Sequence, residues 1–116
     1  MGLFGGVGRR SPRAALAARG ERRAEVEQAR RHLEHFVRTR AGVEAFIEPA
    51  TSLIPPTVLL VATSGEWTRR RVPDPGIVRS LAEDLAVPVY DVRLVGYPPR
   101  MRQWNQQVRP ARDGQD

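Results

Sequence analysis

TVLLVATSGEWTRRRVPDPGIVRSLAEDLAVPVYDVRLVGYP, residues 57–98, is the stretch that decides the fold. Its first part, residues 57–63, is a nearly continuous apolar run, which predicts a central strand covered on both faces. Ser64-Gly65 then provides a tight reversal into a second run of strand-forming residues, 66–72. The two runs together predict a β-hairpin.

The second part of this stretch contains a helix and a strand. Asp74 is a suitable N-cap and Pro75 suits the first helical position, so a helix is predicted from there to about Ala86. Its apolar side consists of Ile77, Val78, Leu81 and Leu85. Residues 88–96, PVYDVRLVG, then form a last strand, which must return beside an earlier strand by a right-handed crossover.

Upstream of this stretch, residues 21–41 have apolar side chains at three- and four-residue spacing, which predicts an amphipathic helix. The apolar stripe consists of Val26, Ala29, Leu33, Phe36 and Val37. Residues 43–48 then alternate between apolar and polar, as a half-buried strand does. Ser11 and Pro12 can start only a frayed helical turn or two before Gly20.

Downstream, Pro98 and Pro99 can start a short helix in which Met101, Trp104 and Val108 share one face. The predicted order is therefore α-β-β-β-α-β-α. This order indicates the α+β class, as a two-layer sandwich with a four-stranded mixed sheet and helices on one face.

The length of 116 residues fits one domain with a modest core. The predicted α+β domain covers residues 21–109. Residues 1–20 are expected to form a disordered basic N-terminal tail, and residues 110–116 a C-terminal tail. The open face of the sheet is expected to present alternate side chains of its strands: Glu44, Phe46, Glu48, Trp67, Arg69, Arg71, Asp91 and Arg93.

Charge is distributed unevenly along the chain. All 19 basic residues are Arg, and the net charge is +6. Residues 21–98 hold eleven Arg and eleven acidic residues, whereas residues 1–20 and 99–112 hold four Arg each and no acid. The predicted body is therefore neutral, with the excess positive charge in the two ends. Such ends favour a polyanionic partner, because Arg neutralises phosphates and releases their counterions.

Composition and spacing disfavour several other chemistries. The chain has no Cys, which excludes disulfides, a thiolate nucleophile and a zinc–thiolate site. His32 and His35 lie three residues apart with no further ligand indicated, which favours structural or solvated histidines over a metal site. No motif indicates a cofactor. No apolar run approaches the ~20 residues of a membrane span, the Leu3-Phe4 start gives only marginal membrane attachment, and a cytoplasmic location is expected.

The basic cluster Arg69 to Arg71 beside Trp67 is one candidate site. An aromatic face accepts a base and an Arg fork matches phosphate oxygens, so these residues can bind nucleic acid. Alternatively, carboxylates on neighbouring strands pair with these Arg residues across the sheet, which is the favoured interpretation. These carboxylates belong to Glu44, Glu48 and Asp91. With the basic ends, the candidate nucleic-acid-binding residues are Arg9, Arg10, Arg13, Trp67, Arg69, Arg70, Arg71, Arg100 and Arg102.

Residues 96–104, GYPPRMRQW, form the other candidate site, because they combine two aromatic residues, two prolines and two Arg residues. Met101 and Trp104 either close the core as part of a docking helix or act with Tyr97 as interface anchors. Exposed Tyr, Trp and Arg are enriched at interface hot spots. The candidate protein-interaction residues are therefore Tyr97, Met101 and Trp104.

The phrases GVEAFIEP, GEWTRRRV and VPVYDVRLVGYPPRMR lie within residues 42–104. They resemble phrases of short actinobacterial proteins that have no known activity, so the resemblance implies a bacterial cytoplasmic protein and no site residues. The element order also resembles that of double-stranded-RNA-binding domains and of restriction-endonuclease-like nucleases. An active nuclease is disfavoured, because Thr57 stands where such enzymes place an Asp and the chain has no Lys.

We therefore expect a small non-enzymatic binding module that contacts RNA, DNA or a ribonucleoprotein through its Arg-rich ends. One alternative is a protein-interaction adaptor or homodimer that uses residues 97–104. Another is an enzyme whose site is assembled from residues distant in the sequence.

Overall fold

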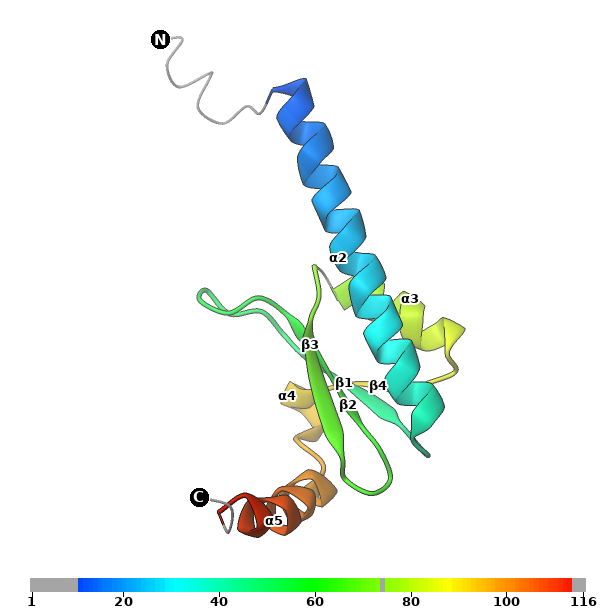
Figure 1. Ribbon diagram of the computed structural model, residues 1–116, viewed down its shortest axis with the longest axis vertical. Coiled ribbons are helices and arrows are strands. Elements are labelled where there is room, and N and C mark those ends of the chain that lie inside the picture. Colours follow the sequence, from blue (N-terminus) through cyan, green and yellow to red (C-terminus); the bar gives the residue numbers. More distant parts are fainter. Residues whose placement is uncertain (1–10, 74, 114–116) are drawn as a thin grey trace.

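The computed structural model describes residues 11–73 and 75–113, with side chains up to residue 108. Within this part, helices and a four-stranded mixed sheet follow the predicted order with one short helix added, which confirms the α+β class (Figure 1). The elements are α2 (Pro12–Thr39), β1 (Glu44–Glu48), β2 (Thr57–Val61), β3 (Trp67–Arg71), α3 (Pro75–Asp84), β4 (Val89–Asp91), α4 (Val92–Val95) and α5 (Pro99–Asp113). The strand order is β3-β2-β1-β4, in which β1 pairs antiparallel with β2 and parallel with β4, and β2 pairs antiparallel with β3.

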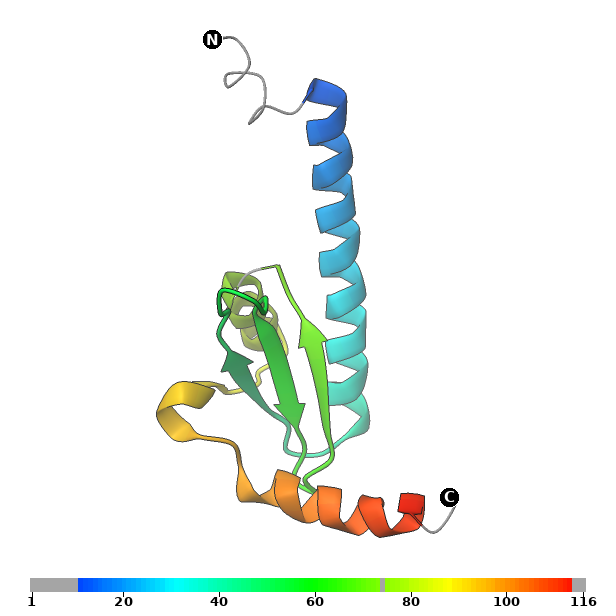
Figure 2. The ribbon, with the colours of Figure 1, turned by 90° about the vertical axis from the view of Figure 1, so that its left-hand side faces the viewer.

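Helix α2 begins directly after Ser11, whose hydroxyl accepts a hydrogen bond from the Ala14 backbone N–H at 3.1 Å. The helix then continues through Gly20 without a break (Figure 2). Gly costs a helix only about 1 kcal/mol relative to Ala, and the neighbouring Ala and Arg residues favour helix. Residues 12–20, which the sequence predicts as part of a disordered tail, are therefore helical, and residues 1–10 lie outside the described residues.

Strand β2 is central and buried on both faces, as predicted. Val58 and Leu60 point to one side of the sheet and belong to the larger hydrophobic cluster. Leu59 and Val61 point to the other side and belong to a second cluster. The two-residue side-chain period of a strand produces this division. The predicted hairpin is also present, with Val61 opposite Trp67.

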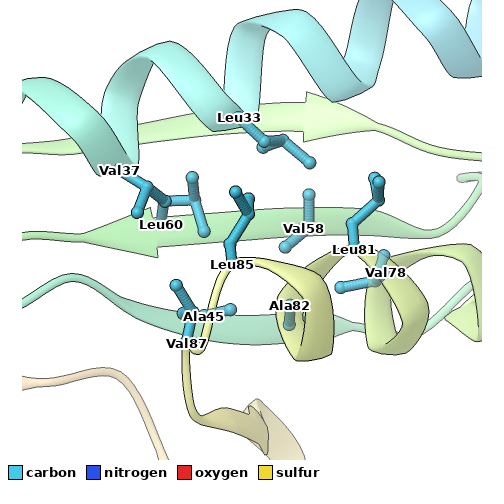
Figure 3. Close-up of a pocket in the computed structure, with 10 residues that line it drawn as sticks. All are labelled: Leu33, Val37, Ala45, Val58, Leu60, Val78, Leu81, Ala82, Leu85 and Val87. Atoms are coloured by element: carbon cyan, nitrogen blue, oxygen red, sulfur yellow. The ribbon is translucent and has the colours of Figure 1, made fainter.

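Helices α2 and α3 together cover one face of the sheet, and Figure 3 shows their apolar side chains meeting those of β1 and β2. Leu33 of α2 and Val78 and Leu81 of α3 are buried there. The space left between these elements has a volume of about 10 Å³, which is at the lower limit for holding one water molecule. This face is therefore a filled core and not a ligand cavity.

The second face is covered at one end by the start of α5, which runs past the end of the sheet where β2 turns into β3 (Figure 2). Met101 is 8% exposed and packs with Phe46, Leu59 and Val61, while Trp67 adds cover at the rim. The position of α5 differs from the prediction that the helices lie on one face. The physical reason is the apolar surface of β2 on this side, because burying such surface is favourable by about 25 cal/mol per Å².

Strand β4 is shorter than the strand predicted over residues 88–96. It ends at Asp91, whose carboxylate accepts a hydrogen bond from the Arg93 backbone N–H at 2.8 Å and caps the short helix α4. In the parallel register Tyr90 pairs with Phe46, and the two ring centroids lie 5.4 Å apart. The open face therefore presents Tyr90 in place of the predicted Asp91 and Arg93, which form a salt bridge with each other at 2.9 Å.

Helix α5 packs against the β2–β3 turn because Gly65 lies there. Gly65 has a φ of +94°, and a Cβ added to it would lie 2.1 Å from the Arg100 carbonyl oxygen. Gly alone combines this backbone conformation with so close a contact. The backbone of α5 is then helical to Asp113, whereas the sequence predicts a tail over residues 110–116, of which residues 114–116 lie outside the described part.

Replacing Gly65 by Ala is expected to destabilise the protein more than replacing Gly96 by Ala. Both glycines have a positive φ, a conformation that costs a non-Gly residue about 1–2 kcal/mol. However, no atom lies within 4 Å of a Cβ added at Gly96. Urea unfolding measures both free energies, and equal losses in the two variants would show that α5 is not held against the turn.

Candidate functional site

A groove of about 390 Å³ lies between β3 and the beginning of α5. Its lining combines aromatic, basic and amide side chains with apolar ones: Trp67, Arg69, Tyr97, Pro98, Met101, Arg102 and Asn105. Trp67, Arg69 and Arg102 come from the predicted nucleic-acid-binding set. Tyr97 and Met101 come from the predicted protein-interaction set. The fold therefore brings residues of two candidate sites into one groove.

Trp67 forms one wall of the groove and is held from two directions. Its indole Nε1–H donates a hydrogen bond to Asn105 Oδ1 at 2.9 Å. The Arg69 guanidinium lies over the ring, with Cζ 5.2 Å from the ring centroid, which is within the range of a cation–π interaction. The orientation of the ring is therefore set by α5 on one side and by β3 itself on the other.

The carboxylate of Glu48 is the polar centre beside the groove. Arg69 donates to it from Nε at 2.6 Å and from Nη2 at 3.0 Å, a two-pronged arrangement that strengthens the pair. The Tyr97 hydroxyl donates to Glu48 Oε2 at 2.5 Å, and the Thr57 hydroxyl donates to Oε1 at 2.7 Å. The predicted cross-strand pairing of Glu48 with Arg69 is therefore present, with Tyr97 added from the segment before α5.

These contacts shift the pKa values of the cluster. Burial by itself would raise the pKa of the Glu48 carboxyl, but hydrogen bonds from Arg69, Tyr97 and Thr57 lower it below its ordinary value. The hydrogen bond to Glu48, followed by burial, raises the pKa of the Tyr97 hydroxyl. Both shifts move these groups away from a pKa near neutrality, which general acid–base catalysis favours. The cluster is therefore better suited to fixing side chains than to transferring protons.

The two arginines at the start of α5 differ in their availability. Arg100 points to the sheet, where it donates to Glu44 Oε1 at 2.6 Å and to the Ala62 carbonyl at 2.9 Å. Arg102 is exposed at the groove and forms no salt bridge within the part of the chain that the structure describes. Arg102 is therefore the groove cation that remains available to a ligand.

The other predicted Arg residues lie away from the groove. Arg71 is exposed at the end of the edge strand β3, and Arg70 lies on the side of β3 that faces α2. Arg13 is exposed on the first turn of α2, whereas Arg9 and Arg10 lie outside the described residues. The groove thus gathers only part of the predicted basic set.

The predicted protein-interaction residues are divided between core and surface. Met101 is buried, Trp104 is half-buried beside Gly65, and Tyr97 is 53% exposed. Helix α5 therefore docks on its own domain through Met101, whereas Trp104 belongs to neither hydrophobic cluster and Tyr97 remains at the surface. Sequence reasoning did not single out Asn105, although it lies one helical turn after Met101, and this spacing places it on the same side of the helix.

An exposed apolar patch adjoins the groove on the side of α4. Leu94 is 84% exposed and Val95 is 56% exposed. Between Val95 and the sheet lies a hollow of about 210 Å³ whose lining includes Phe46, Tyr90 and Tyr97. Sequence reasoning missed Leu94 and Val95 because it placed both in the last strand.

His32 and His35 have different surroundings on α2. Among the residues that the structure describes, no group of three or more His, Cys, Asp or Glu side chains is placed to hold a metal ion. His32 Nε2 lies 2.8 Å from the Thr68 hydroxyl, whereas His35 is exposed. His32 therefore links α2 to the edge strand β3.

Comparison with known proteins assigns no family to the chain. No protein-family model, curated protein or solved structure matched it. Across residues 11–73 and 75–113, no helix has both the length and the apolar character needed to span a membrane.

Lowering the pH below about 6.5 is expected to reduce the free energy of unfolding through His32. Burial, with a smaller contribution from the charge of Arg70, lowers the pKa of His32 in the folded state below its ordinary value of 6.5. The folded state therefore disfavours the proton, so this stability is present above the unfolded pKa and decreases as the pH falls through the folded pKa. Urea unfolding over a pH series measures the effect.

His32→Gln should make this pH dependence shallower, because the variant lacks the half-buried ring whose protonation the folded state disfavours. A His32→Gln variant with the same pH dependence as the parent protein would show that His32 does not cause it.

Proposed function

We propose that this chain is a non-enzymatic binding module for single-stranded nucleic acid, which lies across the groove between β3 and α5. The supporting observation is the meeting of Trp67, Arg69 and Arg102 in one open groove. Aromatic faces accept bases of any sequence by stacking, and guanidinium groups bind phosphate oxygens. A lining that offers both kinds of group suits a nucleotide chain.

The two groove arginines have different roles in this proposal. Arg69 is bound to Glu48 and lies over Trp67, so it stiffens the stacking wall. Arg102 is exposed and supplies the phosphate contact. Tyr97 supplies a second ring, which is 53% exposed and is oriented by its hydrogen bond to Glu48. Stacking of a base on such a ring contributes about 1–3 kcal/mol.

The charge of the whole chain supports the same type of partner. The net charge is +6, and exposed Arg residues are present along the projecting half of α2 (Figure 1). Positive charge steers polyanions toward the protein, and each phosphate contact releases counterions. A single strand is favoured over a duplex because only unpaired bases can turn their faces onto Trp67 or Tyr97.

Replacing Arg102 by Gln is expected to weaken the binding of a labelled single-stranded oligonucleotide. Loss of one phosphate contact should make the slope of log affinity against log salt concentration shallower by about 0.7. Arg79→Gln is the matched control, because Arg79 is exposed on α3, on the opposite side of the sheet. Fluorescence anisotropy between about 50 and 200 mM salt measures both quantities.

Two outcomes would contradict the proposal. One is the absence of binding, or binding that is as strong at about 200 mM salt as at 50 mM, because phosphate contacts weaken with salt. The other is an equal loss of affinity in Arg102→Gln and Arg79→Gln, which would place the binding outside the groove.

A second candidate function is a protein-interaction adaptor, which the exposed patch of Leu94, Val95 and Tyr97 favours. Leu94→Asp is expected to change the free energy of unfolding by no more than about 0.5 kcal/mol, since Leu94 is 84% exposed. The same variant should remove a protein partner that is cross-linked to the parent chain in cells. Unchanged cross-linking in Leu94→Asp would exclude the patch as the contact.

A further inference from the structure

Helix α2 extends well beyond the body of the protein (Figures 1 and 2). Its first buried residue is Ala29, so residues 12–28 form a helical arm ahead of the packed half. Leu16, near the start of the arm, is 65% exposed. Most of the stability of a helix in a protein comes from packing of its apolar side, and the arm has no buried residue. Packing against another surface would therefore stabilise the arm.

One side of the arm has small residues in its middle and opposite charges at its two ends. We call this side the arm stripe, and its residues follow at three- and four-residue intervals: Arg13, Leu16, Gly20, Ala24 and Glu27. Gly20 and Ala29 are separated by about two and a half helical turns. The arm stripe therefore faces away from the sheet, on the side of α2 opposite to Ala29.

We propose that the arm stripe pairs with the arm stripe of a second copy of this chain, with the two arms antiparallel and Gly20 at their crossing point. This register sets Arg13 level with Glu27 of the second copy, because the two residues are equally far from Gly20 in sequence. It also sets Leu16 level with Ala24 of the second copy. Opposite charges then meet at both ends, with apolar side chains between them.

Charge complementarity favours a second copy of the chain as the partner and the antiparallel orientation of the two arms. A parallel pair would set Arg13 against Arg13 and Glu27 against Glu27, and like charges repel. The antiparallel pair is complementary to itself, as a two-fold symmetric contact must be. Within the described part of the chain, neither Arg13 nor Glu27 forms a salt bridge, so both charges are available.

Gly20 allows the two arms to approach closely, because it has no Cβ and no atom lies within 4 Å of one built onto it. The two bodies do not obstruct the contact, since each packs on the other side of α2 and only from Ala29 onward (Figure 2). The arm is about 25 Å long. The contact is therefore small and belongs with weak, exchanging interfaces, which a covalent trap can detect.

The chain has no Cys, so single-Cys variants of the full chain can trap the pairing as a disulfide. Under mild oxidation, Gly20→Cys is expected to give several-fold more disulfide-linked dimer than Ala24→Cys or Gln28→Cys. In the antiparallel pair the two copies of residue 24 lie about 12 Å apart along the helix axis, whereas a disulfide requires Cα atoms within about 7 Å. Only residues at the crossing point meet their own counterparts.

Charge reversal supplies a second measurement. Arg13→Glu is expected to reduce the trapping of the Gly20→Cys dimer several-fold, and adding Glu27→Arg should restore it, because the pair is then reversed but complementary. Circular dichroism confirms that the helix content of each variant is retained. Equal trapping at Gly20→Cys and Gln28→Cys would overturn the pairing, and equal trapping at Gly20→Cys and Ala24→Cys would overturn the antiparallel register. Failure of this pairing leaves oligonucleotide binding in the groove unaffected.

Discussion

Strand β2 requires cover on both of its faces, and the arrangement of the other elements follows from this requirement. Val58 and Leu60 are buried under α2 and α3, whereas Leu59 and Val61 are buried on the opposite face. Helices α2 and α3 both lie on one face of the sheet, so they leave the other face uncovered. The chain therefore returns α5 to the second face, where Met101 completes the smaller cluster.

The groove exists because α5 covers only part of the second face of the sheet. Helix α5 reaches only one end of the second face, so polar side chains close the rest through charge and hydrogen bonds, as Glu48 does with Arg69 and Tyr97. Trp67 lies at the boundary between the apolar packing of α5 and these polar contacts. Asn105 of α5 and Arg69 of β3 both hold its ring. The Trp67 ring, the Arg69 guanidinium that is bound to Glu48 and the exposed Arg102 guanidinium thus meet where the apolar packing ends. The helical arm of residues 12–28 takes no part in the groove.

Most of the elements could be predicted because their signals are local, as in the apolar run of residues 57–63, the Ser64-Gly65 reversal and the alternation of residues 43–48. The short helix α4 and the first turns of α2 are the exceptions. Side-chain partners could not, because they depend on register between distant strands. Tyr90 faces the open side because of where β4 pairs with β1. Arg100 is occupied because Glu44, 56 positions earlier, lies across from it. No pattern within a single element predicts the β1–β4 register or the contact between Arg100 and Glu44.

The two-sided cover of β2 is tested most directly by comparing Leu59→Ala with Leu60→Ala in urea unfolding. The two leucines are 0% and 3% exposed and point to opposite faces. If the second face is a packed layer of the core, each variant should lose about 2–5 kcal/mol of unfolding free energy. A loss below about 1 kcal/mol for Leu59→Ala, beside a full loss for Leu60→Ala, would show that the second face is open.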